Sequence, residues 1–354
     1  MTRSVEFRRV VHAGAALFAA VLLAGVSACG QTSDAVAIDG DDIGGVVSGP
    51  DGPEAGVWVI AETMDLPTRF NRTVVTDDQG RYLIPDLPDA TYDVWVRGYG
   101  LVDSRKIRTT PGSSEDLTAV VAPDPHAAAQ YYPAAYWFSL IEVPEKNEFP
   151  GTGPQGNGIS PSIGSQSAFV RSLKSGGCMA CHQLGGKATR EIPEALGEFA
   201  STSDAWARRI QSGQAGGSMV GGLSRLGQTR AVEMFADWTD RIVAGEVPPT
   251  PPRPQGEERN VVITQWDWAD PTAYLHDEAS TDKRDPTVNA YGPIYGALEA
   301  SADYVPVLDP VSNMASQVPL PVRDPNTPVA SGPPLQPSPY WGDEAIWDSK
   351  ANAH

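Results

Sequence analysis

The sequence has few cysteines, few basic residues and no long hydrophobic run. Its 354 residues contain three cysteines, too few to build the disulfide scaffold of a small secreted domain. Lysine and arginine total 26 against 44 acidic residues, and the net charge of -18 argues against a nucleic-acid binder, which needs a basic surface. The most apolar stretch, residues 13–24, is shorter than the roughly 20 residues that cross a bilayer. Hydrophobic residues still make up 41% of the chain, enough for packed cores.

The N-terminus has the pattern of a secretory signal. Arginines precede the apolar stretch, and the small residues Val26–Ala28 precede Cys29. This ending resembles the lipobox of bacterial lipoproteins, which implies a signal peptide at 1–28, cleavage before Cys29, lipidation of its thiol and a tether at 29–37. An ordinary signal peptide and an uncleaved anchor are the alternatives. We expect a lipid-anchored protein of the cell envelope that faces the periplasm, and Gly30 favours the outer over the inner membrane.

Residues 38–122 carry short strand patterns separated by turn signals. Tyr92, Val94 and Val96 alternate with polar or amphipathic residues, as in a strand buried on one face. Runs of β-branched and aromatic residues predict strands at 46–47, 57–61, 81–84 and 92–96. The pattern predicts a small antiparallel β-sandwich.

The order of turns and strands in 42–100 resembles the carboxypeptidase-regulatory-like, or transthyretin-like, domain. The motifs that carry this resemblance are Thr-Asp-Asp-Gln-Gly-Arg-Tyr at 76–82 and Leu-Pro-Asp-Ala-Thr-Tyr at 87–92. The family implies a structural or interaction module, and the domain has no His and Glu set for zinc. Asp77 and Asp78 lack the alternating ligand spacing of a calcium loop, so we interpret them as a plain turn.

The other two cysteines lie in the run Cys-Met-Ala-Cys-His at 178–182. A C-x-x-C-H run is typical of c-type haem attachment, in which Cys178 and Cys181 bind the porphyrin and His182 coordinates the iron. A zinc site would need further ligands, and a thioredoxin-like pair would need a βαβ context. A structural disulfide is the remaining alternative. The sequence therefore predicts one covalently bound haem c.

Residues 160–247 resemble class I cytochrome c. Apolar periodicity predicts helices at about 165–175, 203–212 and 228–244, the second capped at Ser203–Asp204. The resemblance implies an all-α domain in which the first and last helices cross, with Phe169 against Trp238. It also implies that the carbonyl of Pro193 accepts the ring N–H of the haem-ligating histidine, which orients the imidazole.

The sixth ligand of the iron is expected to be Met219, in a glycine-rich segment that we interpret as a flexible loop. Such a soft thioether raises the reduction potential and leaves no open coordination position. Met234 lies among core positions, while Met179 falls inside the attachment motif. The remaining candidates lie outside the helical domain: Met314, His126 and His276.

The rest of the chain is expected to be linkers and a second β region. We interpret 123–159 as an aromatic segment followed by a linker and 248–257 as a stiff proline-rich linker. Strand patterns at 261–268 and 304–309 predict two blades of a propeller-like β region over 258–354, which resembles the opening of a streptogramin-lyase-like propeller. Two blades cannot close a ring, so we expect a longer chain or a partner that completes this region.

The sequence thus predicts a multidomain protein: an antiparallel β-sandwich, an all-α cytochrome c domain and a partial β region. Its expected function is that of a membrane-anchored, periplasm-facing monohaem cytochrome that transfers single electrons to redox proteins of the envelope. An electron carrier is favoured over a catalytic enzyme. One alternative is an electron-outlet subunit or fragment of a propeller-containing oxidoreductase. Another is an envelope scaffold or binding lipoprotein in which haem is secondary.

Overall fold

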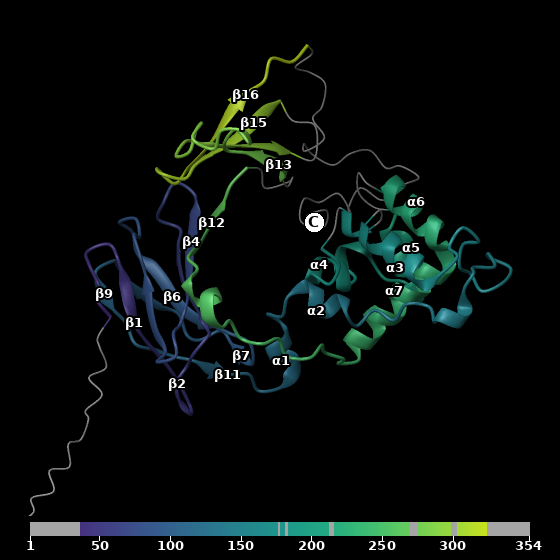
Figure 1. Cartoon of the computed structure of the whole chain (residues 1–354), viewed down its shortest axis with the longest axis horizontal. Helices are drawn as coiled ribbons and strands as arrows, with labels where there is room; N and C mark the ends of the chain where they lie inside the picture. Colours follow the sequence, from purple (N-terminus) through teal and green to yellow (C-terminus); the bar gives the residue numbers. More distant parts are fainter. Residues whose placement is uncertain are drawn as a thin grey trace, which may run out of the picture. The chain divides into compact units, whose positions relative to one another are not determined.

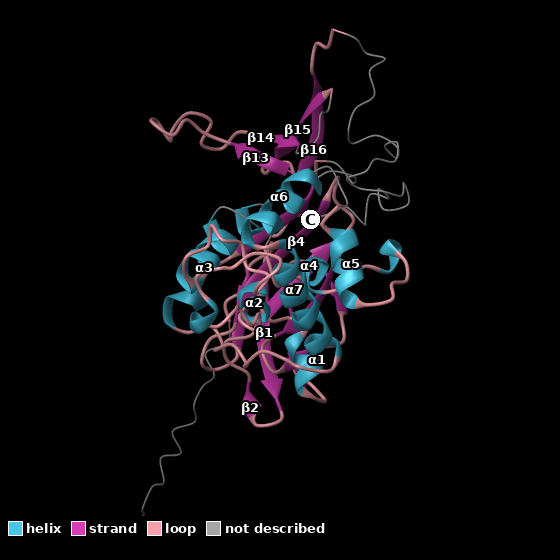
Figure 2. Ribbon diagram, turned by 90° about the vertical axis from the view of Figure 1, so that its right-hand side faces the viewer, coloured by secondary structure: helices cyan, strands magenta, loops and turns pink. Residues whose placement is uncertain are grey.

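A computed structural model describes residues 36–175, 178–180, 183–211, 216–269, 275–298 and 303–323. The described chain is a mixed, β-rich structure, with β regions on both sides, in sequence, of a helical region (Figures 1 and 2). Its sheets are largely antiparallel. The β-rich multidomain architecture predicted from the sequence is therefore confirmed at this coarse level.

Two sheets near the N-terminus share one core. The first is built around β1 (Ile43–Gly49), which pairs with β5 (Arg81–Ile84) and three two-residue strands, β2 (Gly52–Pro53), β9 (Ser113–Ser114) and β10 (Leu117–Thr118). The second has the order β12-β4-β3-β6-β8, with β4 at Arg69–Val75, β3 at Trp58–Thr63, β6 at Tyr92–Arg97 and β8 at Ile107–Thr109. A further short pair joins β7 (Leu101–Val102) to β11 (Val120–Val121). The four strand predictions in this region are confirmed, whereas β4, β8 and the two-residue strands were missed.

Apolar side chains on one face of each strand form the core of the sandwich. Val59 and Ala61 on β3, with Val94 and Val96 on β6, are fully buried and lie in one cluster with Ile43 of β1. Side chains two residues apart share a face of a strand, so both sheets direct an apolar face inward. Apolar burial at about 25 cal/mol per Å² is the dominant stabilisation of such a core.

The predicted turn at Asp77–Gly80 is confirmed. The Asp77 carboxylate accepts backbone N–H groups of Gln79 at 2.9 Å and Arg81 at 2.8 Å, which accounts for its role as a turn residue. Gly80 has φ +71°, and a Cβ there would lie 2.4 Å from the carbonyl oxygen of Val47. This turn therefore requires glycine on both conformational and steric grounds.

The helical region contains α3 (Gln166–Ser175), η2 (Cys178–Ala180), α4 (Lys187–Arg190), η3 (Glu194–Leu196), α5 (Thr202–Arg209), α6 (Gly216–Leu226) and α7 (Gln228–Val243). Three predicted helices correspond to α3, α5 and α7. The cap of α5 differs from the prediction: Ser201 is the N-cap, and its hydroxyl accepts the N–H of Asp204 at 3.1 Å. A serine oxygen at this position satisfies one of the free N–H groups of the first turn.

Large aromatic side chains form the centre of the helical core. Phe169 of α3 and Trp238 of α7 are both fully buried in it. Trp206 of α5 stacks on Phe235 with ring centroids 4.8 Å apart, and its Nε1 donates to Thr239 Oγ1 at 2.9 Å. The indole N–H is thus satisfied inside the core, as buried tryptophans generally require.

The Gly/Pro/Ser-rich end of segment 123–159, expected from the sequence to be a linker, belongs to this helical core, as does the aromatic part before it. They include α1 (Pro125–Ala129), α2 (Ala134–Phe138) and η1 (Lys146–Glu148). Trp137 and Ile159 are 1% and 0% exposed, and the Trp137 carbonyl accepts Trp238 Nε1 at 3.0 Å. The Gly, Pro and Ser content suggests flexibility, but the backbone is hydrogen-bonded. The N–H of Gly151 donates to the carbonyl of Ile163, and the N–H of Ser160 donates to the carbonyl of Leu226.

Replacing Ile159 by alanine is expected to lower the free energy of unfolding by about 2–5 kcal/mol, because a buried isoleucine loses its packing and leaves a cavity. The matched control is Val243→Ala in α7, whose side chain is 78% exposed and whose loss should change stability by about 0.5 kcal/mol or less. Chemical denaturation followed by tryptophan fluorescence measures both. Equal, small effects would mean that the segment is a linker after all.

The proline-rich stretch 248–257 is irregular and held by side-chain contacts. Thr250 Oγ1 is 3.0 Å from the hydroxyl of Tyr132, and Arg253 Nε donates to the Tyr99 carbonyl at 3.2 Å. The short helix η4 (Gly256–Asn260) follows it.

The C-terminal β region differs from the two predicted blades. Strand β12 (Ile263–Asp267) pairs antiparallel with β4, from Ile263 opposite Thr73 to Asp267 opposite Arg69, and so belongs to a sheet of the sandwich. The boundary predicted at residue 258 is therefore wrong for this strand. Trp266 explains the register, because its ring lies 6.2 Å from that of Phe70 at the sandwich core.

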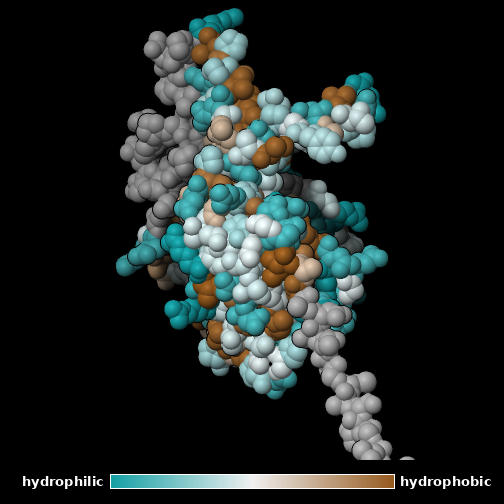
Figure 3. Space-filling model, turned by 90° about the vertical axis from the view of Figure 1, so that its left-hand side faces the viewer, coloured by the Kyte–Doolittle hydropathy of each residue, from teal (hydrophilic) through white to brown (hydrophobic). Residues whose placement is uncertain are grey.

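One four-stranded antiparallel sheet follows, in the order β13 (Leu275–Ala279), β14 (Ile294–Leu298), β15 (Tyr304–Asp309) and β16 (Met314–Pro319). Val307 and Leu308 of β15 are buried, whereas every residue of β16 is exposed. Trp266 Nε1 donates to Asn313 Oδ1 at 2.8 Å, between β15 and β16. Figure 3 shows hydrophobic and hydrophilic residues intermixed over the face that it presents.

Candidate haem site

Cys178 is the first residue of the short helix η2, which begins three residues after the end of α3 at Ser175. Its side chain is half-buried and packs against the helical core, as does that of Met179. Cys181 and His182 lie outside the described residues, and so does Cys29. The structure therefore places Cys178 at the edge of the helical core. The roles of all four residues stay predictions.

Met219 lies in helix α6, which corrects the interpretation of this segment as a flexible loop. Each glycine costs a helix about 1 kcal/mol relative to alanine, and α6 contains four of them. Packing outweighs this cost, because Leu223 and Leu226 are each 2% exposed and belong to the helical core. Met219 itself is half-buried and borders the same core as Cys178.

Pro193 precedes the short helix η3, and its carbonyl accepts the N–H of Leu196 at 3.0 Å. A carbonyl oxygen has two lone pairs, so this bond leaves one for the predicted ring N–H of His182. Its neighbour Ile192 packs against the helical core. The position is compatible with the role that the cytochrome resemblance implies.

The other candidate iron ligands are dispersed. Met234 is 3% exposed within the core, as predicted, and Met314 is 48% exposed on β16. His126 lies in α1 and lines a cleft of about 470 Å³ together with Glu191, Thr202, Asp240 and neighbouring residues of α7. Strand β13 contains His276. Among the candidate ligands whose side chains the structure describes, only Met219 and Met179 are half-buried and border the helical core, as Cys178 does. Met179 lies inside the attachment motif itself, which leaves Met219 as the candidate.

Two buried N–H donors in the helical region have no acceptor among the described residues: Nε1 of Trp137 and Nε of Arg190. The Arg190 residue is 4% exposed, and its guanidinium lies over the Trp137 ring, 4.1 Å from the centroid. Leaving such a donor unpaired costs about 1–3 kcal/mol. Burial lowers the pKa of Arg190, which Glu191 partly offsets, yet a guanidinium remains charged at neutral pH. These donors suit an anionic group, which haem carries as propionates.

The sequence interpretation missed Trp137 and Arg190 as site residues. The aromatic cluster at 131–138 is visible in the sequence, but aromatic residues alone do not distinguish a binding site from a core. Nothing in the sequence around Arg190 indicates a buried or binding residue, because a single arginine in a polar stretch is typical of a solvated surface. Only the fold brings the two side chains together.

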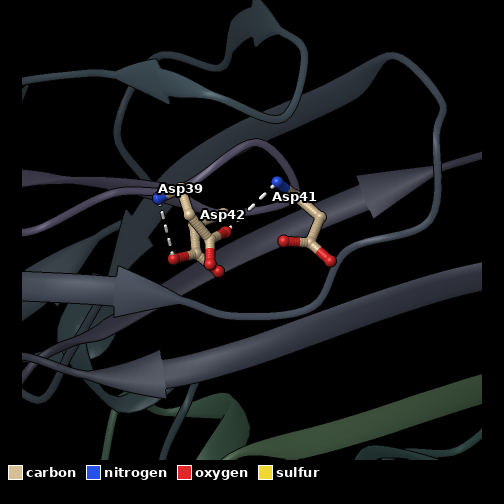
Figure 4. A group of neighbouring side chains, drawn as sticks. All are labelled: Asp39, Asp41 and Asp42. Carbon is tan, nitrogen blue, oxygen red and sulfur yellow. Dashed lines mark hydrogen bonds between the residues drawn. The ribbon is translucent and has the colours of Figure 1, made fainter.

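A cluster of carboxylates lies elsewhere, before β1, where Asp39, Asp41 and Asp42 approach one another within 4.8 Å (Figure 4). The two oxygens of Asp42 accept the backbone N–H groups of Asp39 and Asp86, each at 3.2 Å. Asp41 N–H donates in turn to Asp39 Oδ1 at 3.3 Å. These hydrogen bonds order the local turn and account for the cluster.

Within the described ranges, no helix has both the length and the apolar character needed to cross a bilayer. Comparison with known proteins adds no assignment. No protein-family model matches the sequence, and no curated protein matches it.

Proposed function

We propose that the protein is a lipid-anchored, periplasm-facing c-type cytochrome that carries one covalent haem and transfers single electrons between proteins of the cell envelope. The observation that carries the proposal is the C-x-x-C-H run, whose first cysteine borders the same helical core as Met219. The sulfur, imidazole and thioether groups available are the ligand set of a low-spin c-type haem. When bound, the haem supplies reversible one-electron chemistry.

The chain's residues have distinct roles in this proposal. Cys178 and Cys181 would hold the porphyrin covalently, and His182 and Met219 would supply the imidazole and thioether ligands of the iron. Pro193 accepts the ring N–H of His182 and fixes its orientation. Two protein ligands of this kind would leave no place for a substrate to bind the iron, which favours electron transfer over catalysis.

The flanking regions support an envelope protein rather than an isolated carrier. In this proposal the sandwich is a carboxypeptidase-regulatory-like module, the helical region is a class I cytochrome c domain and lipidated Cys29 holds both at the membrane. Among the described residues β16 is the last strand of its sheet and its residues are exposed, and an unpaired sheet edge is a surface on which another strand can pair. A partner that completes the C-terminal β region is therefore part of the proposal.

A spectroelectrochemical titration of the full chain, produced with haem-attachment machinery, tests this function. We expect a c-type optical spectrum that changes between two forms along a one-electron Nernst curve, with full recovery on reoxidation. Binding of carbon monoxide by most of the reduced wild-type protein would indicate an open iron and contradict a pure electron carrier. A purified protein without any haem absorption would overturn the proposal entirely.

A further inference from the structure

The two unpartnered donors lie on different segments that pack directly together. Trp137 is in α2, and Arg190 ends α4 (Figure 1). Gly185, which precedes α4, sits so close to α2 that a Cβ on it would lie 1.9 Å from the carbonyl oxygen of Ala134. The loop that follows the haem-attachment motif is therefore packed onto α2 without room for a side chain.

Arg190 is fixed in place by two contacts that leave its charge uncompensated. Its Nη1 donates to the Gly185 carbonyl at 2.9 Å, and the guanidinium plane lies over the Trp137 ring. The nearest carboxylate, of Glu191, is 3.8 Å away, and its side chain is 43% exposed. A contact of this length to a solvated group contributes little. The buried positive charge therefore lacks a close anionic partner among the described residues.

Trp137 is held equally firmly. It is 1% exposed, and its carbonyl accepts the indole N–H of Trp238 from α7. Its own Nε1 has no acceptor within the described part of the chain. Trp137 and Arg190 are in contact, and each has a buried N–H without an acceptor among the described residues. A carboxylate suits such a pair, because its two oxygens accept several hydrogen bonds and pair strongly with guanidinium.

We propose that Trp137 and Arg190 form a buried carboxylate site that binds a propionate of the haem. The inference rests on the proposed function, because the haem is the source of this carboxylate. Gly185, to which Arg190 donates, is three residues after His182, so the site lies close to the attachment motif in sequence. The segment before residue 160 is then part of the haem pocket rather than a connection to it.

Three variants test the site in the haem-loaded full chain: Trp137→Phe, Arg190→Lys and Arg190→Gln. Trp137→Phe keeps the ring and removes the N–H; Arg190→Lys keeps the charge and removes the guanidinium. Arg171→Gln is the matched control, because Arg171 is an exposed cation on α3. Haem content, the propionate bending modes in resonance Raman spectra and the midpoint potential are measured on each protein.

We expect all four variants to keep covalent haem and the three site variants to show shifted propionate modes. Arg190→Gln should also lower the midpoint potential more than Arg171→Gln, because a buried charge is screened less than an exposed one and favours the ferrous state. Arg190→Lys should recover most of the potential while its Raman modes remain altered.

The results of these measurements distinguish a failure of the propionate site from a failure of the proposed function. If the wild type binds no haem, the proposed function fails and the inference with it. If haem is attached but the propionate modes of Trp137→Phe and Arg190→Lys match the wild type, the inference alone is overturned. Thermal stabilisation of the loaded wild type by added acetate, absent in Arg190→Gln, would show a site that takes a free carboxylate, which also overturns propionate binding.

Discussion

Replacing Cys178 and Cys181 together by alanine is expected to abolish covalent haem attachment. The thioether bonds to these two sulfurs are the only covalent link between haem and chain in the proposal, and no cysteine other than Cys29 remains in the chain. The variant should lose all haem that survives denaturing electrophoresis, as detected by peroxidase staining. Each single replacement should keep at most one thioether bond and shift the spectrum accordingly.

The matched control is Met179→Leu, which changes the residue beside Cys178 without removing a thiol. It should retain stained haem at the wild-type level, since leucine and methionine have similar volumes. Haem that remains bound to the double variant through denaturation would contradict the attachment site. A wild-type chain that carries a Cys178–Cys181 disulfide in place of haem would favour the alternative of a structural bridge.

The second large effect is expected at Met219. Its replacement by alanine removes the proposed axial thioether, so the midpoint potential should fall and the iron should gain an open position. Axial ligands set haem potentials over a range of about 0.8 V, so this should be the largest potential shift of any single change that leaves the haem attached. The oxidised protein should also lose the near-infrared charge-transfer absorption that marks methionine ligation.

Met234→Leu is the matched control, because Met234 is 3% exposed within the helical core and is not proposed to bind iron. It should leave the potential and the charge-transfer absorption unchanged. Imidazole should bind to Met219→Ala and not to the control. A methionine charge-transfer absorption that persists in Met219→Ala would mean that another methionine, such as Met314, binds the iron. Its absence from the wild type would instead favour a histidine ligand, with His126 and His276 as the candidates.

The helices and strands that follow a simple periodicity could be predicted from the sequence. On α7, Phe235, Trp238 and Ile242 lie on one face, and all three are buried. Alternation on β6 likewise identified Tyr92, Val94 and Val96 as the buried face of a strand. In both cases local propensity and burial agree, so the pattern determines the structure.

Helix α6 shows where such a prediction fails. Its glycines favour a loop locally, while Leu223 and Leu226 gain their stabilisation only from the rest of the core. Composition misled in the same way at 150–161, where Gly, Pro and Ser suggest a linker but Ile159 is fully buried. In both segments long-range packing outweighs the local preference.

The sheet to which β12 belongs was wrongly predicted for a different reason. Its sequence correctly predicts a strand, but the partner, β4, is nearly 200 residues earlier in the chain, as the pairing of Thr264 with Arg72 illustrates. Strand patterns carry no information about distant partners. The prediction of a C-terminal blade rests only on the closeness of β12 in sequence to the strands that follow it. The same limit applies to the candidate site: Trp137 and Arg190 are brought together only by the tertiary fold.

The most direct test of the central claim is the mass of the proteolytic peptide that contains residues 178–182, from chain produced together with haem-attachment machinery. The account predicts that this peptide is heavier than its sequence mass by one haem, joined at both cysteines, and that no other peptide carries haem. A peptide of unmodified mass, or one that differs only by the loss of two hydrogens in a disulfide, would contradict it.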